Sequence, residues 1–217
     1  MYFITFEGPD GSGKTTQIGE VAAWFRARGY EVVRTREPGG TAIGDQIRQV
    51  LMEMGNQALV PSAEFLLFSA SRAQHVRELI RPALAEGKIV LCDRFADSSL
   101  AYQGYGHGLP LEQLHMITAF ATDGLVPDLT LLLDIDVAVA LQRRRKAVAV
   151  EGAEWTRIDD YKLAFHRRIR QGYHKLAAAE PQRWRLVNAA QPVAAVQQTI
   201  RKELNTFLRQ KTPKTEQ

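Results

Sequence analysis

One glycine-rich segment constrains the fold of this chain more than any other part of the sequence. It reads Gly8-Pro9-Asp10-Gly11-Ser12-Gly13-Lys14-Thr15 and continues with Thr16, so it fits the phosphate-loop pattern G-x-x-x-x-G-K-S/T. A short apolar run at 2–6 precedes it, and an amphipathic helical pattern at 16–28 follows it. In this order, backbone N–H groups and a helix N-terminus converge on a phosphate. The segment therefore predicts nucleotide binding by residues 8–16.

Two positions outside the glycines suit a nucleotide with bound magnesium. Lys14 offers a mobile positive charge to the outer phosphates, and the Thr15 hydroxyl is a natural ligand of Mg²⁺. Asp93 ends an apolar run at 88–93, and an acid at the carboxyl end of such a strand commonly orders Mg²⁺ through water. Arg94 follows it, and its planar guanidinium can hold a second phosphate. We expect Thr15 and Asp93 (through water) to hold the metal. The alternative is a plain ion pair at the strand end.

Strand and helix patterns alternate along the chain, which predicts a parallel sheet with helices on both faces. We expect strands at 2–6, 30–35, 88–93, 128–134 and 184–187, and helices at 16–28, 43–54, 62–80, 97–103, 111–122, 137–146, 158–179 and 193–208. Pro82 should break or kink the third helical segment. The fold class expected is α/β, a P-loop NTPase three-layer αβα arrangement with a five-stranded parallel sheet. A single domain is expected over 1–211, with a disordered tail at 212–217.

Composition narrows the class of partner. The chain has 217 residues, with 28 Lys and Arg against 24 Asp and Glu. This mild excess suits small anionic substrates, and no interleaved aromatic platform accompanies the basic clusters, so no nucleic acid is expected. No apolar run reaches membrane-spanning length and the start does not read as a signal peptide, so no membrane partner is expected. A single cysteine, Cys92, favours a reducing, cytoplasmic location.

The helix expected at 62–80 is too apolar for one buried face. It is either sandwiched in the core or covered on one side by a partner subunit, and a homodimer through this helix is expected. Phe68 and Arg72 lie four residues apart and share a face of it. They form either a core ring beside a surface charge or a stacking plate and hydrogen-bond donor for a base.

A basic cluster, Arg143-Arg144-Arg145-Lys146, precedes a stretch without clear period at 147–156, and Arg157 follows. Such a cluster is ordinarily a solvated helix face. Beside a phosphoryl-transfer site, a mobile basic segment can instead close over the phosphates. We expect a lid at about 143–157.

Several motifs together resemble one known family. They are Glu7 to Thr15, Thr35-Arg36-Glu37-Pro38-Gly39-Gly40-Thr41, Leu66 to Arg72, Asp93-Arg94-Phe95 and Ser98 to Gly104. In order and content they resemble thymidylate kinases of the bacterial type. The resemblance implies transfer of the γ-phosphoryl group of ATP to dTMP, giving dTDP, with Mg²⁺ as cofactor. It also implies a homodimer.

The resemblance implies a role for each acceptor residue. Phe68 would stack on thymine and Arg72 would donate to its O4. Arg94 would hold the dTMP phosphate, and Asp10 would lie near the sugar 3′-hydroxyl. Tyr102 would lie where a ribose 2′-hydroxyl would have to fit. The full set implied for dTMP binding is Asp10, Glu37, Pro38, Phe68, Arg72, Arg94, Ser98, Ser99, Tyr102 and Gln103.

The catalytic arginine is the point where the chain departs from the family. Some similar kinases carry an Arg in the phosphate loop directly after the acidic residue, and this chain has Gly11 there. The lid segment also differs, because Thr156-Arg157-Ile158-Asp159 replaces the usual Asp-Arg-Ile/Phe-Glu. We therefore expect a lid arginine to act beside Lys14, Arg94 and Asp10 in catalysis. Arg145 is the first choice, then Arg143, then Arg157.

Two other functions remain as alternatives at this point. One is a kinase for another nucleoside monophosphate, although Phe68, Arg72, Ser99 and Gln103 suit a pyrimidine with an O4 acceptor. The other is a nucleotide-dependent switch protein without an acceptor, which would need neither Arg94 nor Phe68.

Overall fold

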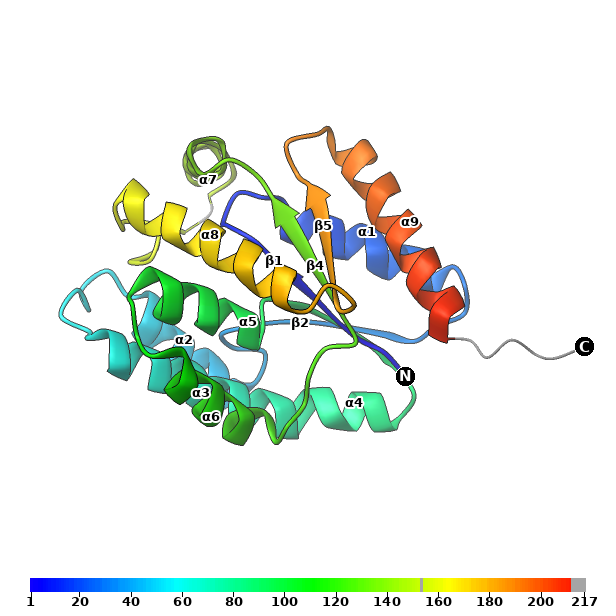
Figure 1. The fold of residues 1–217 in the computed structure, drawn as a ribbon, viewed down its shortest axis with the longest axis horizontal. Helices are drawn as coiled ribbons and strands as arrows, with labels where there is room; N and C mark the ends of the chain where they lie inside the picture. The colour runs from blue at the N-terminus through cyan, green and yellow to red at the C-terminus, as the bar shows by residue number, and fades with distance from the viewer. Residues whose placement is uncertain (153, 212–217) are drawn as a thin grey trace, which may run out of the picture.

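A five-stranded sheet forms the centre of the molecule (Figure 1), and the computed structural model describes residues 1–152 and 154–211. The strand order is β2-β3-β1-β4-β5 and every neighbouring pair is parallel. The strands are β1 (Phe3–Glu7), β2 (Val32–Arg36), β3 (Ile89–Asp93), β4 (Leu129–Asp134) and β5 (Trp184–Asn188). The predicted fold class is confirmed.

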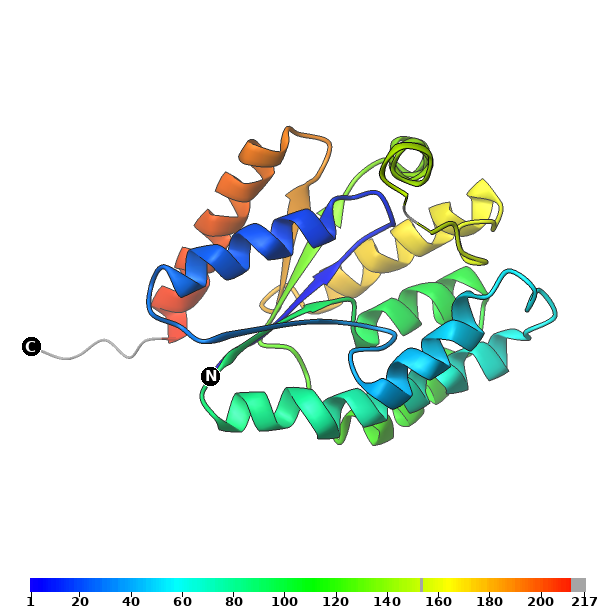
Figure 2. The same ribbon diagram turned by 180° about the vertical axis from the view of Figure 1, so that it is seen from behind.

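Two helices, α1 (Lys14–Arg26) and α9 (Val193–Lys211), cover one face of the sheet and lie side by side (Figure 2). Leu131 and Leu133 of β4 pack into the cluster beneath them, while Leu132 between them packs into the cluster on the opposite face. Since side chains alternate along a strand, a strand buried on both faces must be apolar at successive positions. This explains the continuous apolar run of β4.

All the remaining helices except the one over the phosphate loop lie toward the opposite face and surround the acceptor side of the molecule. They are α2 (Ala42–Met52), α3 (Pro61–His75), α4 (Arg81–Ala85), α5 (Ala96–Ser99), α6 (Leu111–Thr122) and α8 (Leu163–Ala179), with π-helical turns η1 (Val76–Ile80) and η2 (Leu100–Gly106). The α8 helix packs over β4 and β5, whereas η1 and α4 pack over β1 and β3.

Pro82, which was expected to break or kink the helix, does not break it, because helical structure continues from Pro61 through η1 to Ala85. The N–H of Arg81 donates to the Val76 carbonyl, five residues back. Proline has no N–H to donate, and the π turn places the change of hydrogen-bond register directly before it.

The lid is more helical than its sequence indicates. The α7 helix (Val137–Glu151) continues through the first half of the stretch that lacks a clear period, and α8 begins at Leu163 rather than at 158. The phosphate loop supports α7 directly, because a Cβ at Gly11 would overlap the Ala140 carbonyl oxygen. Only a glycine permits this close approach, and its φ of 84° also favours glycine.

The sequence also predicts a disordered C-terminal tail and no membrane-spanning helix. The tail expected to be disordered, 212–217, lies outside the described residues. Within the described ranges, none of the helices combines the length and apolar character needed to cross a membrane.

Candidate active site

The phosphate loop joins β1 to α1, and Gly8, Gly11 and Gly13 all have positive φ. The predicted loop residues 8–13 lie in this turn, and Lys14, Thr15 and Thr16 open α1. Lys14 is buried and its Nζ donates to the carbonyls of Gly8 at 3.1 Å and Pro9 at 3.0 Å. Burial lowers the pKa of Lys14, and the charge of Arg94 adds to this effect. The loop therefore has the positive charge, and the N-terminus of α1 has the N–H groups, that a polyphosphate needs.

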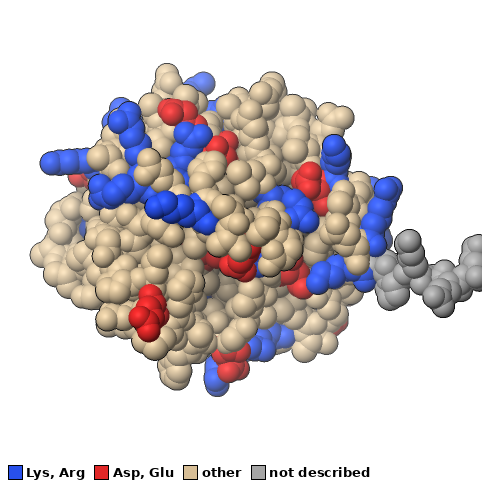
Figure 3. All heavy atoms as spheres, viewed as in Figure 1, with Lys and Arg blue, Asp and Glu red and all other residues tan. Residues whose placement is uncertain are grey.

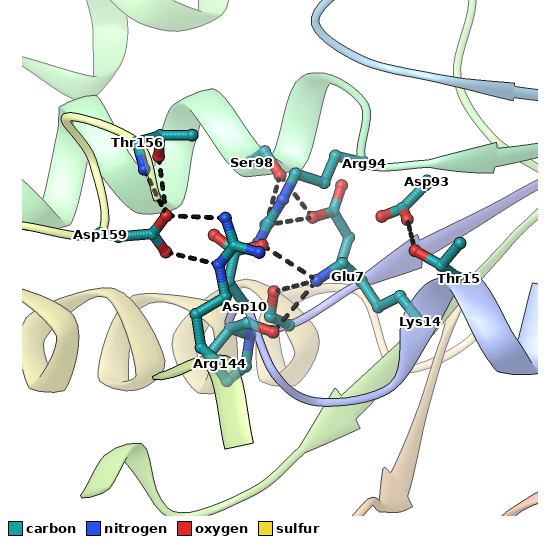
Figure 4. Close-up of polar contacts among 12 residues, drawn as sticks. Glu7, Asp10, Lys14, Thr15, Asp93, Arg94, Ser98, Arg144, Thr156 and Asp159 are labelled. Carbon is teal, nitrogen blue, oxygen red and sulfur yellow. Dashed lines mark hydrogen bonds and ion pairs between the residues drawn. The ribbon is translucent and has the colours of Figure 1, made fainter. Parts of the chain in front are cut away.

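Thr15 and Asp93 meet at the mouth of this loop, as Figure 4 shows. The Thr15 Oγ1 donates to Asp93 Oδ2 at 3.0 Å. A hydroxyl and a carboxylate at the edge of a phosphate site suit Mg²⁺, which takes one or two protein ligands and completes its shell with water and phosphate oxygens. Within the described residues no group of three or more His, Cys, Asp and Glu side chains could hold a metal alone. The donor set fits a metal that binds together with a nucleotide.

Arg94 lies between the phosphate loop and the second half of the site. It follows β3 in the left-handed region, with φ of 67°, and its guanidinium is mostly buried. Nη2 donates to Asp10 Oδ1 at 2.9 Å, while Nη1 donates to the Tyr173 hydroxyl at 3.1 Å and Ser98 Oγ at 3.3 Å. Although burial alone would raise it, the charges of Arg94 and Lys14 lower the pKa of Asp10.

A buried carboxyl group, Glu7, supports Arg94 from behind. Its Oε1 accepts from the Phe95 N–H at 2.9 Å, and its Oε2 accepts from Ser98 Oγ at 2.6 Å and the Tyr173 hydroxyl at 2.8 Å. Burial, together with the charge of Asp97, raises the pKa of Glu7 to about 7. Sequence reasoning gave no role to Glu7 or Tyr173. The position of Glu7 at the end of β1 is the one signal that could have found it.

A cavity beside Arg94 brings together every predicted acceptor residue except Arg72. It is lined by Asp10, Glu37, Pro38, Phe68, Arg94, Ser98, Ser99, Tyr102 and Gln103, and also by Arg48, Met52, Arg144, Thr156 and Ile158, which the sequence did not indicate. The residues therefore come from the loops that follow β1, β2 and β3, from α2, α3, α5 and η2, and from the lid region. We call this the acceptor cavity.

Arg72 is buried next to the acceptor cavity and is held firmly in place. Nε donates to Glu37 Oε2 at 2.8 Å, and Nη2 donates to the Phe95 carbonyl at 3.2 Å and Ser99 Oγ at 3.0 Å. Its Nη1 is buried and has no partner within residues 1–152 and 154–211. Glu37 also bonds His75 Nδ1 at 3.2 Å. One donor of a fixed guanidinium is thus left for a ligand.

The three lid arginines that were expected to act in catalysis do not lie at the phosphate loop. Arg145, the first choice, is exposed and makes no ion pair or hydrogen bond with a described residue. Arg143 donates to the carbonyls of Ala189 at 2.8 Å and Ala190 at 3.3 Å. Arg157 is 1% exposed and pairs with Glu64. None of these three lines a cavity at the phosphate loop.

Arg144, which the sequence did not single out, has the position expected of a lid arginine. It lines the cavity at the phosphate loop together with Asp10, Gly11, Lys14, Thr15 and Asp93, and it also lines the acceptor cavity. Its Nε and Nη2 donate to Asp159 at 3.0 and 2.9 Å, as Figure 4 shows. In Figure 3, positive side chains gather over α7 and α8.

Comparisons with known proteins agree with this geometry. A family model described as thymidylate kinase matches residues 6–200. The chain is 50% identical over 205 residues to a thymidylate kinase of Roseiflexus sp. (strain RS-1), covering 91% of each chain. It is 53% identical over 190 residues to one of Deinococcus radiodurans, covering 88% of this chain and 89% of the relative. Its fold matches the crystal structure of a thymidylate kinase from Ehrlichia chaffeensis with a TM-score of 0.75 and 34% identity, over 94% of this chain and 98% of the other.

The raised pKa of Glu7 predicts a pH dependence of folding stability. Between its unfolded value of 4.5 and about 7 the folded state binds the extra proton. The stability contributed by the protonated carboxyl is fully present below 4.5 and is lost as pH rises to about 7. Relative to Glu7→Gln, the wild-type free energy of unfolding should fall by about 3 kcal/mol across this window. Denaturant titrations of both proteins at several pH values measure it, and parallel pH profiles would contradict the prediction.

Proposed function

This chain belongs to the thymidylate kinase family and catalyses the ATP-dependent phosphorylation of dTMP to dTDP, and we propose that its two adjoining cavities hold the two nucleotides. The observation that carries this assignment is the shared wall between the cavities. Asp10 and Arg144 line both the acceptor cavity and the cavity at the phosphate loop. A phosphoryl group can therefore pass from donor to acceptor across a single boundary.

The acceptor cavity has the side chains that dTMP needs. Phe68 provides an aromatic face for thymine, and the unpaired Nη1 of Arg72 provides a fixed donor for its O4. Arg94 holds the acceptor phosphate, and Tyr102 lies beside it with its ring centroid 5.1 Å from the Arg94 guanidinium carbon. The remaining wall consists of Glu37, Pro38, Ser98, Ser99 and Gln103, with Asp10 at the end next to the phosphate loop.

The phosphate loop binds ATP through residues 8–16, and Mg²⁺ binds with it. Thr15 would hold the metal directly and Asp93 would hold it through water. Their hydrogen bond of 3.0 Å places both groups at the edge of the loop. Bound there, Mg²⁺ would neutralise charge on the outer phosphates. Lys14 keeps its ammonium in the loop by bonding carbonyls of Gly8 and Pro9, and it exchanges these partners for phosphate oxygens.

Catalysis in this site consists of positioning and charge neutralisation. Phosphoryl transfer needs no protein nucleophile, since the dTMP phosphate oxygen attacks the γ-phosphorus in line. Arg94 orients the acceptor, and its bond to Asp10 fixes it at the boundary between the cavities. Arg144 approaches the transferred group from the lid, with Asp159 holding its guanidinium from the far side. This replaces the order of lid arginines that the sequence suggests.

The acceptor preference tests the assignment of the acceptor cavity. We expect kcat/KM to be highest for dTMP, lower for dUMP and lowest for UMP. A missing methyl group costs about 1–3 kcal/mol of discrimination, and a ribose hydroxyl against the buried Tyr102 costs more. Steady-state kinetics with the three acceptors measures this order, and UMP used as well as dTMP would refute it.

Neighbouring arginines give a matched test of the lid. Arg144→Ala should lower kcat by roughly 10²-fold or more, with a smaller change in KM for dTMP, because the contact forms mainly in the transition state. Arg145→Ala removes the same charge one position away, from an exposed side chain, and should stay within about threefold of wild type. Single-turnover transfer rates measure both. A large loss in Arg145→Ala with Arg144→Ala unaffected would reverse the assignment.

We also propose a cytoplasmic enzyme with one kinase domain over 1–211, a lid at about 143–157, and a homodimeric assembly. Some apolar residues of the 62–80 segment are buried in the core, and others are exposed and available to a partner subunit. Phe65, Val76 and Ile80 are core residues, whereas Leu66 is exposed. Met116 and Phe120 of the neighbouring α6 are 62% and 87% exposed, and the face over α3 and α6 carries few charges in Figure 3. The second copy covers this α3–α6 face.

Light scattering tests the homodimer. The wild-type protein at micromolar concentration should show twice its chain mass of 24.3 kDa. Phe120→Asp should yield the single-chain mass, because it buries an unpaired charge in the interface. Val193→Asp, also at an exposed apolar position but on α9, is the control and should remain dimeric. A wild-type monomer at every concentration would rule out the assembly.

A further inference from the structure

One residue of the acceptor cavity has its orientation fixed by a group outside the cavity. Gln103 lies on η2 and lines the acceptor cavity. Its Nε2 donates to Glu64 Oε1 at 2.7 Å, and both side chains are 1% exposed. Glu64 lies on α3 and does not line the cavity.

Glu64 can only accept hydrogen bonds, because donors surround its carboxylate. Oε2 accepts from Arg157 Nη2 and lies 3.5 Å from the Tyr161 hydroxyl. His107 Nε2 lies 3.5 Å from Oε1. Although burial alone would raise it, the neighbouring groups of His107, Arg157 and Gln103 lower the pKa of Glu64. The ionised carboxylate has four lone-pair sites and no proton to donate.

This chemistry decides which end of the Gln103 amide faces Glu64. An amide carries a donor end and an acceptor end that are nearly equal in shape. A carboxylate can bond only the NH₂ end, so the Oε1 end is the one left for a ligand. Gln103 Oε1 accepts no hydrogen bond from any residue in the described ranges.

Arg72 provides a hydrogen-bond donor that complements the Gln103 acceptor. Its Nη1 is a donor without a partner in the described part of the chain, while its other nitrogens are bonded to Glu37, Phe95 and Ser99. A free donor and a free acceptor match a base with a carbonyl next to a ring N–H. Thymine has O4 next to N3–H, whereas cytosine has an amino group next to an unprotonated N3.

We propose that Glu64 is a specificity-determining positioning residue: it fixes the Gln103 amide so that Oε1 accepts from the pyrimidine N3–H, and the site thereby selects thymine over cytosine. This inference rests on the proposed function, because it takes the acceptor cavity as the dTMP site. Arg157, instead of acting at the phosphates, keeps the Glu64 carboxylate charged.

Two acceptors that share their methyl group, sugar and phosphate test this role. They are dTMP and 5-methyl-dCMP, which differ at N3 and at position 4 of the base. The quantity measured is the ratio of their kcat/KM values, which is independent of the fraction of active enzyme. Glu64→Gln presents either end of an amide to Gln103, so the Gln103 amide is free to turn. The ratio should fall by about tenfold or more, the size of one buried hydrogen bond.

Arg157→Lys is the matched control, because it alters the same buried ion pair from the other side and keeps a positive charge beside the Glu64 carboxylate. The carboxylate stays ionised and faces Gln103, so its ratio should stay within about threefold of wild type. The proposal is overturned if Glu64→Gln also stays within that range, or if Arg157→Lys loses as much preference for dTMP as Glu64→Gln.

The exchanged pair, Glu64→Gln with Gln103→Glu, keeps the test decisive if Glu64→Gln alone does not fold. In that protein the new amide donates to the new carboxylate, whose second oxygen still accepts from N3–H. The preference for dTMP should be retained, and its loss would overturn the proposal. Failure of the proposed function gives a different result, since wild-type protein would then transfer no phosphate to dTMP.

Discussion

The buried charge of Arg94 is the constraint on which the rest of the site depends. A guanidinium removed from water must be surrounded by acceptors, because the unpaired charge costs several kcal/mol. In this protein the acceptors are Asp10 from the phosphate loop, Ser98 from α5 and Tyr173 from α8, with Glu7 from β1 behind them. The hydrogen bonds and ion pairs of the Arg94 guanidinium thus hold the phosphate loop, two helices and two strand ends in a fixed arrangement. That arrangement places the acceptor cavity against the phosphate loop.

Around this centre the protein uses further buried ion pairs to hold polar groups ready for a ligand. Arg72 with Glu37 and Arg157 with Glu64 are all 1–3% exposed in their side chains. Such pairs contribute little net stability, because desolvation offsets their attraction. Their effect is on orientation: each leaves one donor or acceptor pointing at a defined place. A base that matches these groups binds without reorganising them, and a base that does not match leaves a buried group unpaired.

Local signals made much of the fold and site predictable. The phosphate loop, the alternating patterns and the acid at the end of β3 are short-range features. The acceptor residues were implied by short motifs that resemble those of thymidylate kinases. The lid arginine was not predictable in this way. Four basic residues occur in succession at 143–146, and the one that points inward is set by the rotation of α7 on Gly11. The pairing of Arg157 with Glu64 spans 93 residues, and no pattern along the chain indicates it. Tyr173 lies on an apolar stripe of α8, which indicates a core residue. The sequence therefore could not predict that its hydroxyl accepts a hydrogen bond from Arg94.

A crystal structure with dTMP and a non-hydrolysable ATP analogue, both bound, tests the central claim most directly. We expect Arg94 to bond the dTMP phosphate, with an acceptor oxygen about 3–3.5 Å from the γ-phosphorus and Arg144 beside the transferred group. A dTMP phosphate held away from Arg94, with the two nucleotides on opposite sides of Asp10, would contradict it.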